Sequence, residues 1–378
     1  MILEQKHEVF RERVRDFATR VVRPKSEEID HTCEFPWDTV REMGKEGLLG
    51  IPFPKKYGGA GLDHLSYAIA VEEISRVCGS TGVTLAAHVS LGCYPIYVAG
   101  TEAQKKKYLP SLLKGKSISS FGLTEPNAGS DAGATETTAR LDGDKWVING
   151  TKRFITSGAI ADVLVVTASQ DRSKGVHGIS AFIIEKDTPG FSPGKEEEKL
   201  GLRGSVTSEL LFDDCRIPKE NLLGEEYEGF KIFMKTLDGG RISIGAMALG
   251  IAQGALDSSI AYVREQQQAG ISLRKSQFIQ EMIADMDTEI TAARHLVYEA
   301  AVLKDRGQKA TKEGAMAKLY ASETCMRVTS KAVEIHGGRG LTKAYPVERY
   351  FRDAKLTEIG EGTSEIMRVV IAREILGR

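Results

Sequence analysis

A carboxylate between two glycines is the residue of this chain best suited to chemistry on a bound molecule. Glu361 follows Gly360 and precedes Gly362, so no neighbouring side chain blocks its approach to a ligand. Glycines also let the backbone itself come close to that ligand. The same residues fit a helix start in which Thr363 or Ser364 is the N-cap. Taken alone, the segment therefore fits both a catalytic base and a plain helix start.

A second segment combines small residues, backbone donors and hydroxyl groups. It reads Phe121-Gly-Leu-Thr-Glu-Pro-Asn-Ala-Gly-Ser-Asp131, with hydroxyls at Thr124 and Ser130. Loops of this kind suit close contact with a planar or anionic cofactor. The alternative is an ordinary turn built on Pro-Asn and Gly, which explains many shorter matches.

Together the two segments resemble the acyl-CoA dehydrogenase family of flavoproteins. The Leu-Thr-Glu-Pro-Asn-Ala-Gly-Ser-Asp loop and the Arg-Asp-Ala…Glu-Gly-Thr…Ile segment match that family's two most recognisable motifs. Further matches extend the resemblance over essentially the whole chain. It implies an α+β fold with an N-terminal helical domain, a middle β-barrel or sandwich domain and a C-terminal four-helix bundle. It also implies FAD as the cofactor.

The implied reaction is α,β-dehydrogenation of an acyl-CoA to the trans-2-enoyl-CoA. A carboxylate must take the weakly acidic α-proton, while the β-hydrogen leaves as hydride to flavin N5. Such a base needs a raised pKa, which burial beside an acyl chain and a flavin provides. The family has a second place for its base, and that position is Gly240 here. Glu361 is therefore the only matched base.

The resemblance also implies which residues contact the flavin ring and its phosphates. We expect a backbone N–H and a Thr hydroxyl on the ring's polar edge, an aromatic ring beside the flavin and a hydroxyl near N5. The thioester oxygen would accept from the backbone N–H of Glu361 and from a ribityl hydroxyl. For Phe154 the alternative is an ordinary half-buried strand residue. The expected flavin contacts are Phe121, Leu123, Thr124, Ser130, Phe154 and Thr156.

Other residues are expected at the adenine half of FAD, after the base and along the substrate. In this family the neighbouring subunit completes the adenine site, which implies a homotetramer. The further cofactor residues are Gln277, Glu334, Gly337, Gly338, Thr363 and Glu365. The substrate-binding residues are Ser130, which is shared with the flavin, Asp238, Arg241, Gly360 and Gly362.

The chain departs from the family pattern near the ADP half of FAD. Gln266 stands where relatives carry an arginine for the pyrophosphate, and Ala269 where they carry a phenylalanine. A charge-assisted contact and a stacking contact are lost. We therefore expect FAD to be held less tightly there, or in another orientation. Gly360 replaces a tyrosine found in many relatives, which enlarges the pocket beside the reacting carbons.

Composition excludes several other classes of protein. Lys and Arg number 51 and Asp and Glu 52, a balance that argues against a nucleic-acid or membrane-surface protein. No apolar run approaches the roughly 20 residues that a bilayer span needs. The five cysteines are dispersed, as in reduced cytoplasmic proteins, and the seven histidines show no metal-ligand spacing. We expect a cytoplasmic protein without a metal site.

The elements that would position these residues fall into three regions. Residues 1–116 are predicted to be an N-terminal α-domain, with apolar helices over 65–77 and 81–99. Residues 117–225 are predicted to be a β-domain, because several β-rich runs surround the hairpin signal Asp142-Gly143. Residues 226–378 return to helical periodicity.

An apolar stripe and two glycine-rich stretches stand out in these regions. An apolar stripe from Phe278 to Ala301 predicts one long packed helix in the C-terminal region. Two glycine-rich stretches, 58–61 and 337–340, follow no strand of a βαβ unit, so they predict no Rossmann site.

The substrate and the electron acceptor are only partly constrained. Residues 84–91 would line the acyl end, and they hold no arginine for a distal carboxylate. We expect a short to medium acyl chain, with branched or cyclic groups left open by Gly360. His88 fits either a polar pocket lining or a buried histidine with its partners in the protein. The resemblance implies an electron-transferring flavoprotein as acceptor. The alternatives are an enoyl-CoA reductase, a dehydrogenase of cyclic or dicarboxylic acyl-CoA, and a flavin-poor scaffold homologue.

Overall fold

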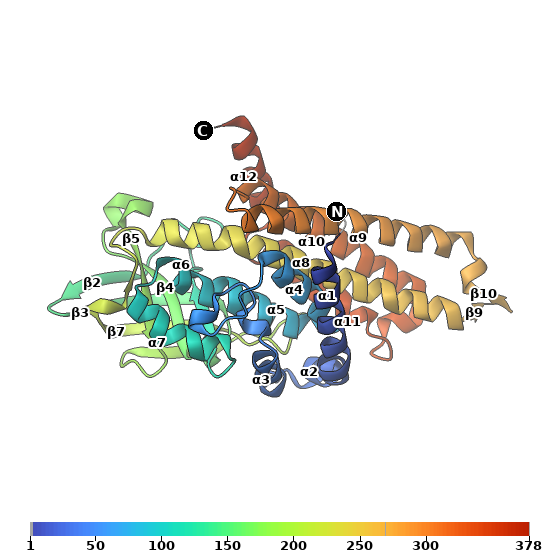
Figure 1. The fold of residues 1–378 in the computed structure, drawn as a ribbon, viewed down its shortest axis with the longest axis horizontal. Helices are drawn as coiled ribbons and strands as arrows, with labels where there is room; N and C mark the ends of the chain where they lie inside the picture. Colours follow the sequence, from blue (N-terminus) through green and yellow to red (C-terminus); the bar gives the residue numbers. More distant parts are fainter. Residues whose placement is uncertain (1–2, 269, 378) are drawn as a thin grey trace.

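The structure is a computed structural model that describes residues 3–268 and 270–377. Figure 1 shows three regions: N-terminal helices in blue and teal, a β-domain in green at the left, and long C-terminal helices in yellow to red. The expected succession of a helical, a β and a second helical domain is confirmed. The N-terminal helices are α1 (Gln5–Phe17), α2 (Ser26–Thr32), α3 (Trp37–Lys45), α4 (His64–Ser75), α5 (Gly79–Ala87), α6 (Tyr94–Ala99) and α7 (Glu102–Leu113).

The helix expected over residues 81–99 forms, but a π-helical turn interrupts it. The chain runs from α5 through the π turn His88–Cys93 into α6. Pro95 explains the interruption, because its ring has no N–H and collides with the carbonyl of Leu91 in a regular α-helix. Such π turns are frequent at functional sites.

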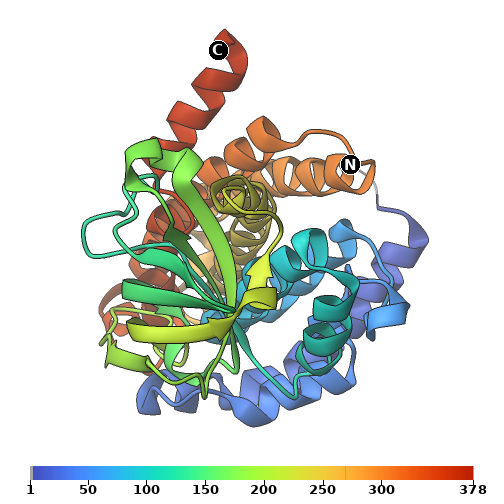
Figure 2. The same ribbon diagram turned by 90° about the vertical axis from the view of Figure 1, so that its left-hand side faces the viewer.

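The β-domain is one mixed eight-stranded sheet. Its strand order is β6-β7-β3-β2-β4-β5-β8, and β1 pairs with β4 in parallel. The predicted hairpin is confirmed, since Asp142 pairs with Lys145 across a two-residue loop in which Gly143 has a φ of +64°. In Figure 2 this sheet lies beside the N-terminal helices and beneath the C-terminal ones. The strands are β1 (Ser119–Gly122), β2 (Thr138–Asp142), β3 (Lys145–Thr156), β4 (Val163–Ser169), β5 (Ile179–Glu185), β6 (Phe191–Glu196), β7 (Thr207–Pro218) and β8 (Leu222–Leu223).

The C-terminal region is a bundle organised by one very long helix. At 1.5 Å per residue, α8 is about 55 Å long, and it runs from the β-domain to the opposite end of the molecule (Figure 1). Figure 2 looks along it, with helices on several sides. The elements are α8 (Gly229–Glu265), the short strands β9 (Gln267–Gln268) and β10 (Ile271–Ser272), α9 (Gln277–Asp305), α10 (Thr311–His336), α11 (Val347–Ile359) and α12 (Ser364–Leu376).

The predicted long helix is α9, but its stripe is only partly in the core. Met286, Ile290 and Val297 are fully buried, as expected. Phe278 is instead 78% exposed, so the expectation that the stripe packs from its first residue is wrong. The first turn of α9 extends past the end of the core, which helix periodicity alone does not show.

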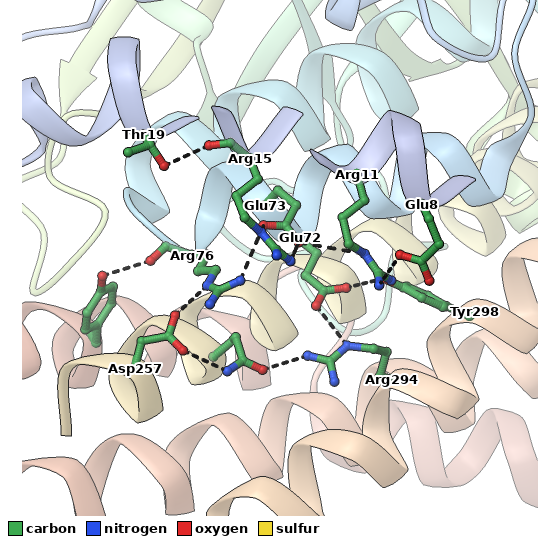
Figure 3. Close-up of polar contacts among 12 residues, drawn as sticks. Glu8, Arg11, Arg15, Thr19, Glu72, Glu73, Arg76, Asp257, Arg294 and Tyr298 are labelled. Carbon is green, nitrogen blue, oxygen red and sulfur yellow. Dashed lines mark hydrogen bonds and ion pairs between the residues drawn. The ribbon is translucent and has the colours of Figure 1, made fainter. Parts of the chain in front are cut away.

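Buried charges join the N-terminal helices to the bundle (Figure 3). Arg15 on α1 donates two hydrogen bonds to Glu73 on α4, at 2.9 and 2.8 Å. The neighbouring Glu72 accepts from Arg294 Nε on α9 at 2.9 Å. Both glutamates are almost fully buried. The network therefore fixes α4, which contributes to the site below, between α1 and the bundle.

Two helical stretches are long and apolar enough to cross a membrane by length and composition. They are Gly79–Ala99 and Gly229–Glu265, and 67% and 72% of their most apolar windows are buried inside the protein. Core helices of this kind pass the same test, so these two stretches are weak indications of a span.

Candidate active site

Glu361 lies in a four-residue loop, Gly360 to Thr363, between α11 and α12. Its φ is +55°, a left-handed conformation that costs a residue other than glycine about 1–2 kcal/mol. The next residue, Gly362, has a φ of +108°, and a β-carbon there would stand 2.6 Å from Met367 Cε. Thr363 then caps α12, because its hydroxyl accepts from the N–H of Ile366 at 3.3 Å. The helix start is thus real, and Glu361, two residues before the N-cap Thr363, is held in a strained conformation.

The Glu361 carboxyl group points at α8. A β-carbon built on Gly240 would stand 1.9 Å from Glu361 Oε2 and 3.2 Å from Leu91 Cδ2. Glu361 Oε2 is buried and has no hydrogen-bond partner among the described residues. The carboxyl group therefore occupies space that exists only because residue 240 lacks a side chain.

Burial determines the acidity of this carboxyl group. It raises the pKa of Glu361 to about 7, and the cations of Lys318 and Arg241 oppose part of that rise. A carboxylate with a pKa near the working pH is well matched to proton abstraction. The Glu361 carboxyl group is thus buried and weakly acidic, as a catalytic base requires.

Arg241 and Asp238 form a pair on the same face of α8. Arg241 Nη1 donates to Asp238 Oδ1 at 2.7 Å, and Asp238 Oδ2 accepts from the Thr311 hydroxyl at 2.9 Å. Arg241 is 7% exposed, yet its Nε has no hydrogen-bond partner in the described chain. The structure thus brings Arg241 next to Glu361 with a donor to spare.

A buried ion pair holds the loop that contains Leu123 and Thr124. Lys152 Nζ lies 2.6 Å from Glu125 Oε1, and both side chains are almost completely buried. Lys152 Nζ also donates to the carbonyl of Leu123 at 3.3 Å, and the N–H of Arg153 donates to the carbonyl of Thr124 at 2.8 Å. β3 therefore fixes the path of this loop.

The aromatic residues predicted at the flavin differ in their setting. The ring of Phe121 is buried and stacks on Phe233 of α8, with centroids 4.0 Å apart, so that its side chain packs within the protein. Phe154 is 57% exposed and has a φ of +56°, which turns it out of β3. It is therefore not the half-buried strand residue that the alternative required. Thr156 is half-buried at the end of β3, whereas Ser130 is exposed in its loop.

The residues predicted at the adenine half lie at one end of the bundle. Gln277 begins α9, Glu334 is in the last turn of α10, and Gly337 and Gly338 follow it. Gly337 has φ and ψ of +57° and −140°, a conformation suited to glycine.

Gln266, which stands where relatives carry an arginine, lies at this same end of the bundle. Gln266 is joined to it, because its side-chain oxygen accepts from Arg339 Nη1 at 2.9 Å. Ala269 lies outside the described residues.

Comparison with known proteins decides the family. Three family models match in succession: the acyl-CoA dehydrogenase N-terminal domain over residues 4–116, the middle domain over 120–215 and the C-terminal domain over 227–376. The chain belongs to the acyl-CoA dehydrogenase family. It is therefore an FAD-dependent oxidoreductase that acts on a CH–CH bond of acyl-CoA.

Similar proteins cover the full length of this acyl-CoA dehydrogenase. The short-chain specific acyl-CoA dehydrogenase of Clostridium acetobutylicum is 56% identical over 99% of this chain and 98% of its own. The acryloyl-CoA reductase (NADH) of Anaerotignum propionicum is 51% identical over 100% and 96%. A solved structure reported with work on the electron transferring flavoprotein of Acidaminococcus fermentans is 52% identical, covers 100% of both chains and has a TM-score of 0.98.

The residues present fit FAD. Phe154 offers an exposed aromatic ring, while Glu361 Oε2 and Arg241 Nε are buried polar atoms without partners among the described residues. Unpaired buried polar atoms of this kind are rare in folded proteins unless a ligand or water completes them. Bound acyl-CoA and FAD would supply partners for these three groups.

Two open clefts elsewhere on the molecule are separate from this site. One of about 510 Å³ lies between α7 and the β-domain, lined by Glu185 and Arg216 among others. Another of about 340 Å³ lies beside α2 and α11, lined by Asp30 and Arg349 among others. Neither is lined by a predicted site residue.

His88 proves to be a buried histidine with partners in the protein. Its Nδ1 accepts from the N–H of Ser119 at 3.2 Å, and its Nε2 lies 3.0 Å from the carbonyl of Leu112. Burial lowers the pKa of His88 to about 4, so that the ring is neutral. His88 therefore joins the π turn to β1 and α7.

Sequence reasoning missed two groups beside the base. Lys318 on α10 is fully buried, and its Nζ donates to the carbonyl of Gly362. The Ser243 hydroxyl donates to the carbonyl of Gly240 at 2.8 Å and lies 3.2 Å from the hydroxyl of Ser90, so that a pair of hydroxyls lies beside Gly240. The available signal was a single lysine on a helix face whose other residues are small or apolar.

Proposed function

We propose that this protein dehydrogenates short-chain acyl-CoA, with Glu361 as the base that takes the α-proton. The observation that supports this most directly is the buried carboxyl group of Glu361, unpartnered within the described chain and placed against Gly240. Its pKa of about 7 lets it accept a proton near neutral pH.

Each part of the site has a role in this proposal. The Glu361 carboxylate receives the α-proton, and the backbone N–H of Glu361 donates to the thioester oxygen as negative charge develops there. Loss of one such donor typically costs about 2.7–4 kcal/mol of transition-state stabilisation. Bound FAD supplies the two-electron oxidation at the β-carbon. Arg241, whose Nε is free of partners among the described residues, binds the substrate beside Asp238.

We propose the following residues as the contacts of FAD. Leu123, Thr124 and Thr156 lie on the loop and strand that the Lys152–Glu125 pair holds in place. Phe154 would lie beside the flavin and Thr363 and Glu365 beyond the base. The remaining proposed contacts are Phe121 through its backbone, Ser130, Gln277, Glu334, Gly337 and Gly338.

A short acyl group is favoured by the wall opposite Glu361. Leu91 lies in the π turn, which His88 fixes to its neighbours. Residues 84–91 contain no arginine for a distal carboxylate. The similar Clostridium protein is named for short-chain substrates. A β-carbon at Gly360 would be crowded by Leu356 Cδ2 at 3.3 Å, so the missing side chain at this position is no argument for a bulky acyl group.

We also propose a homotetramer whose subunits complete one another's adenine sites. Large apolar side chains are exposed at the end of the bundle where Gln266 and Arg339 meet. Phe278 and Leu341 are each 78% exposed and Ile271 is 61% exposed, which is typical of surfaces that a partner covers. A monomer in light scattering would contradict this assembly.

The proposal extends to the electron acceptor, the cellular location and the domain boundaries. The similarity to a structure studied with an electron-transferring flavoprotein supports such a protein as the electron acceptor. The free cysteines, four of them buried, support a cytoplasmic location. Domain boundaries at 116/117 and 225/226 are supported by the change from helices to strands and back.

A second candidate is the reverse reaction, reduction of a short enoyl-CoA. The 51% identity to an acryloyl-CoA reductase favours it. The same base would then return the α-proton, so that the residues of the site cannot distinguish the directions. A flavin-free scaffold is disfavoured by the intact buried base.

One experiment tests the proposed function. Purified protein should be yellow, and anaerobic butyryl-CoA should bleach its flavin absorbance. Crotonyl-CoA with reduced enzyme should restore the colour to the extent that the reverse reaction proceeds. Protein that binds no flavin, or a flavin that no short acyl-CoA bleaches, would contradict the proposal.

A further inference from the structure

A buried lysine lies next to the base without a carboxylate partner of its own. Lys318 on α10 has none of its surface exposed, and lysines this deeply buried are usually paired. In the part of the chain that the structure describes, no carboxylate oxygen lies within 4.0 Å of its Nζ. Its hydrogen bond goes instead to the carbonyl oxygen of Gly362, the residue after the base.

The same helix also holds the other end of the catalytic loop. The hydroxyl of Ser322, one turn after Lys318, shares its proton between the carbonyl of Thr357 at 2.7 Å and that of Lys318 at 2.6 Å. Thr357 and Gly362 lie on either side of Glu361. Two side chains of α10 therefore fix the backbone before and after a residue whose φ is +55°. Strained conformations of this kind persist only when their surroundings determine them.

The ionisable groups around Glu361 come from three helices, and two of these groups, Lys318 and Arg241, are cations. Lys318 faces it from α10, Arg241 from α8 and the phenol of Tyr67 from α4. Asp238 already pairs with Arg241 at 2.7 Å. Lys318 in turn faces the carboxylates of Glu361, Glu358 and Glu365. Lys318 is thus the cation beside the base that no ion pair with another group engages among the described residues.

We propose that Lys318 is a positioning residue for the base: it holds the Gly360–Gly362 loop through the Gly362 carbonyl and supplies a positive charge beside the Glu361 carboxylate. Burial lowers the pKa of Lys318 itself to about 8, so that the ammonium group is charged at neutral and acidic pH, where the acidic limb is measured. The inference rests on the proposed function and deepens it. Lys318 contacts neither of the reacting atoms and transfers no proton. It acts through the position and the ionisation of Glu361.

The positive charge of Lys318 lowers the pKa of Glu361. Burial raises the pKa of Glu361, and Lys318 is the largest influence that opposes the rise. Without the charge, the carboxyl group should hold its proton to higher pH. Abstraction of the α-proton needs the ionised carboxylate. The pH at which kcat rises would therefore be higher without the lysine charge.

The test compares two variants of the FAD-loaded enzyme with the wild type. Lys318→Met keeps the length of the side chain and removes both donor and charge. Lys318→Gln keeps an N–H donor on a shorter side chain and removes the charge. Flavin content and the melting temperature are measured first, then kcat and KM for butyryl-CoA from pH 5.5 to 9.

The proposal predicts a distinct pattern. In Lys318→Met, kcat should fall by about tenfold or more from misplacement of the base, while KM changes by less than about twofold. In both variants the acidic limb of the kcat profile should move up by roughly one pH unit. Lys318→Gln should lose less of kcat at its optimum.

A matched control separates positioning from general stability. Lys199 is a half-buried lysine that also donates to a backbone carbonyl, that of Ser205, at 2.6 Å. Lys199→Met should lower the melting temperature and leave the acidic limb in place. If Lys318→Met does not bind FAD, the pH profile of kcat for Lys318→Gln tests the inference instead, through the same shift of its acidic limb.

An unmoved acidic limb in a folded, FAD-loaded Lys318 variant would overturn the inference. So would an equal loss of rate at every pH, because a purely structural role produces that result. Failure of the proposed function gives a different outcome, since the wild type would then not be bleached by butyryl-CoA. The two failures are thus distinguishable.

Discussion

The carboxyl group of Glu361 occupies the place of the missing side chain of Gly240. A β-carbon at residue 240 would stand only 1.9 Å from Glu361 Oε2, closer than any two such atoms can approach. One residue is on α8 and the other follows α11, so the packing of the bundle brings them together. The base therefore depends on a glycine 121 positions earlier in the chain.

Replacing that glycine should displace the base. In Gly240→Ala the new methyl group forces the Glu361 carboxyl group aside, and kcat should fall by about 10²-fold, because small displacements of reacting groups have effects of that size. Flavin content should stay normal. Gly239→Ala is the matched control, since its β-carbon would meet only the flexible end of Lys304. Equal kcat values for the two variants would argue against the steric relationship.

The rate should depend on the ionisation of Glu361. Because burial raises its pKa to about 7, kcat should rise with pH through about 7 and level off above it. The measurement is kcat for butyryl-CoA at constant ionic strength, with flavin content checked at each pH. A rate that is already at its plateau at pH 5.5 would mean that the carboxyl group has an ordinary acidity.

The same ionisation should affect stability. The folded-state pKa of about 7 lies above the unfolded value of about 4.3. Between these values the folded protein keeps a proton that the unfolded chain has lost, so Glu361 contributes less stability as pH rises. Glu361→Gln should therefore melt near the wild-type temperature at pH 4.5 and above it at pH 8. A difference that is independent of pH would contradict this account.

The Lys152–Glu125 pair should support both stability and flavin binding. Removing one member of a buried pair leaves an uncompensated charge and typically costs about 3–5 kcal/mol. Lys152→Met should therefore lower the free energy of unfolding by about that amount and loosen the loop of Leu123 and Thr124. Flavin content and denaturant unfolding are the measurements. The double variant Lys152→Met with Glu125→Gln should recover part of the loss, and no recovery would point to packing instead of charge.

Much of this site could be predicted because its chemistry is local in sequence. Glu361 between two glycines and the loop from Phe121 to Asp131 are short, distinctive motifs. The hairpin at Asp142-Gly143 and the long helix α9 follow from turn chemistry and periodicity. These features depend on residues close together in the chain.

What sequence could not show depends on contacts between distant segments. Lys318 reads as an ordinary helical lysine until α10 is packed against the catalytic loop. Phe278 fits the apolar stripe of α9, but the core ends before its first turn. Tertiary packing decides both of these. The π turn at His88–Cys93 is different, because Pro95 is a local cause that hydrophobic periodicity alone does not register.

The most direct test of the account is the turnover of Glu361→Gln. Glutamine keeps the shape of the side chain and cannot accept the α-proton, while the flavin site is untouched. We predict a yellow, folded enzyme whose kcat for butyryl-CoA is lower by at least about 10²-fold. Near-normal turnover by that variant would contradict the assignment of Glu361 as the base.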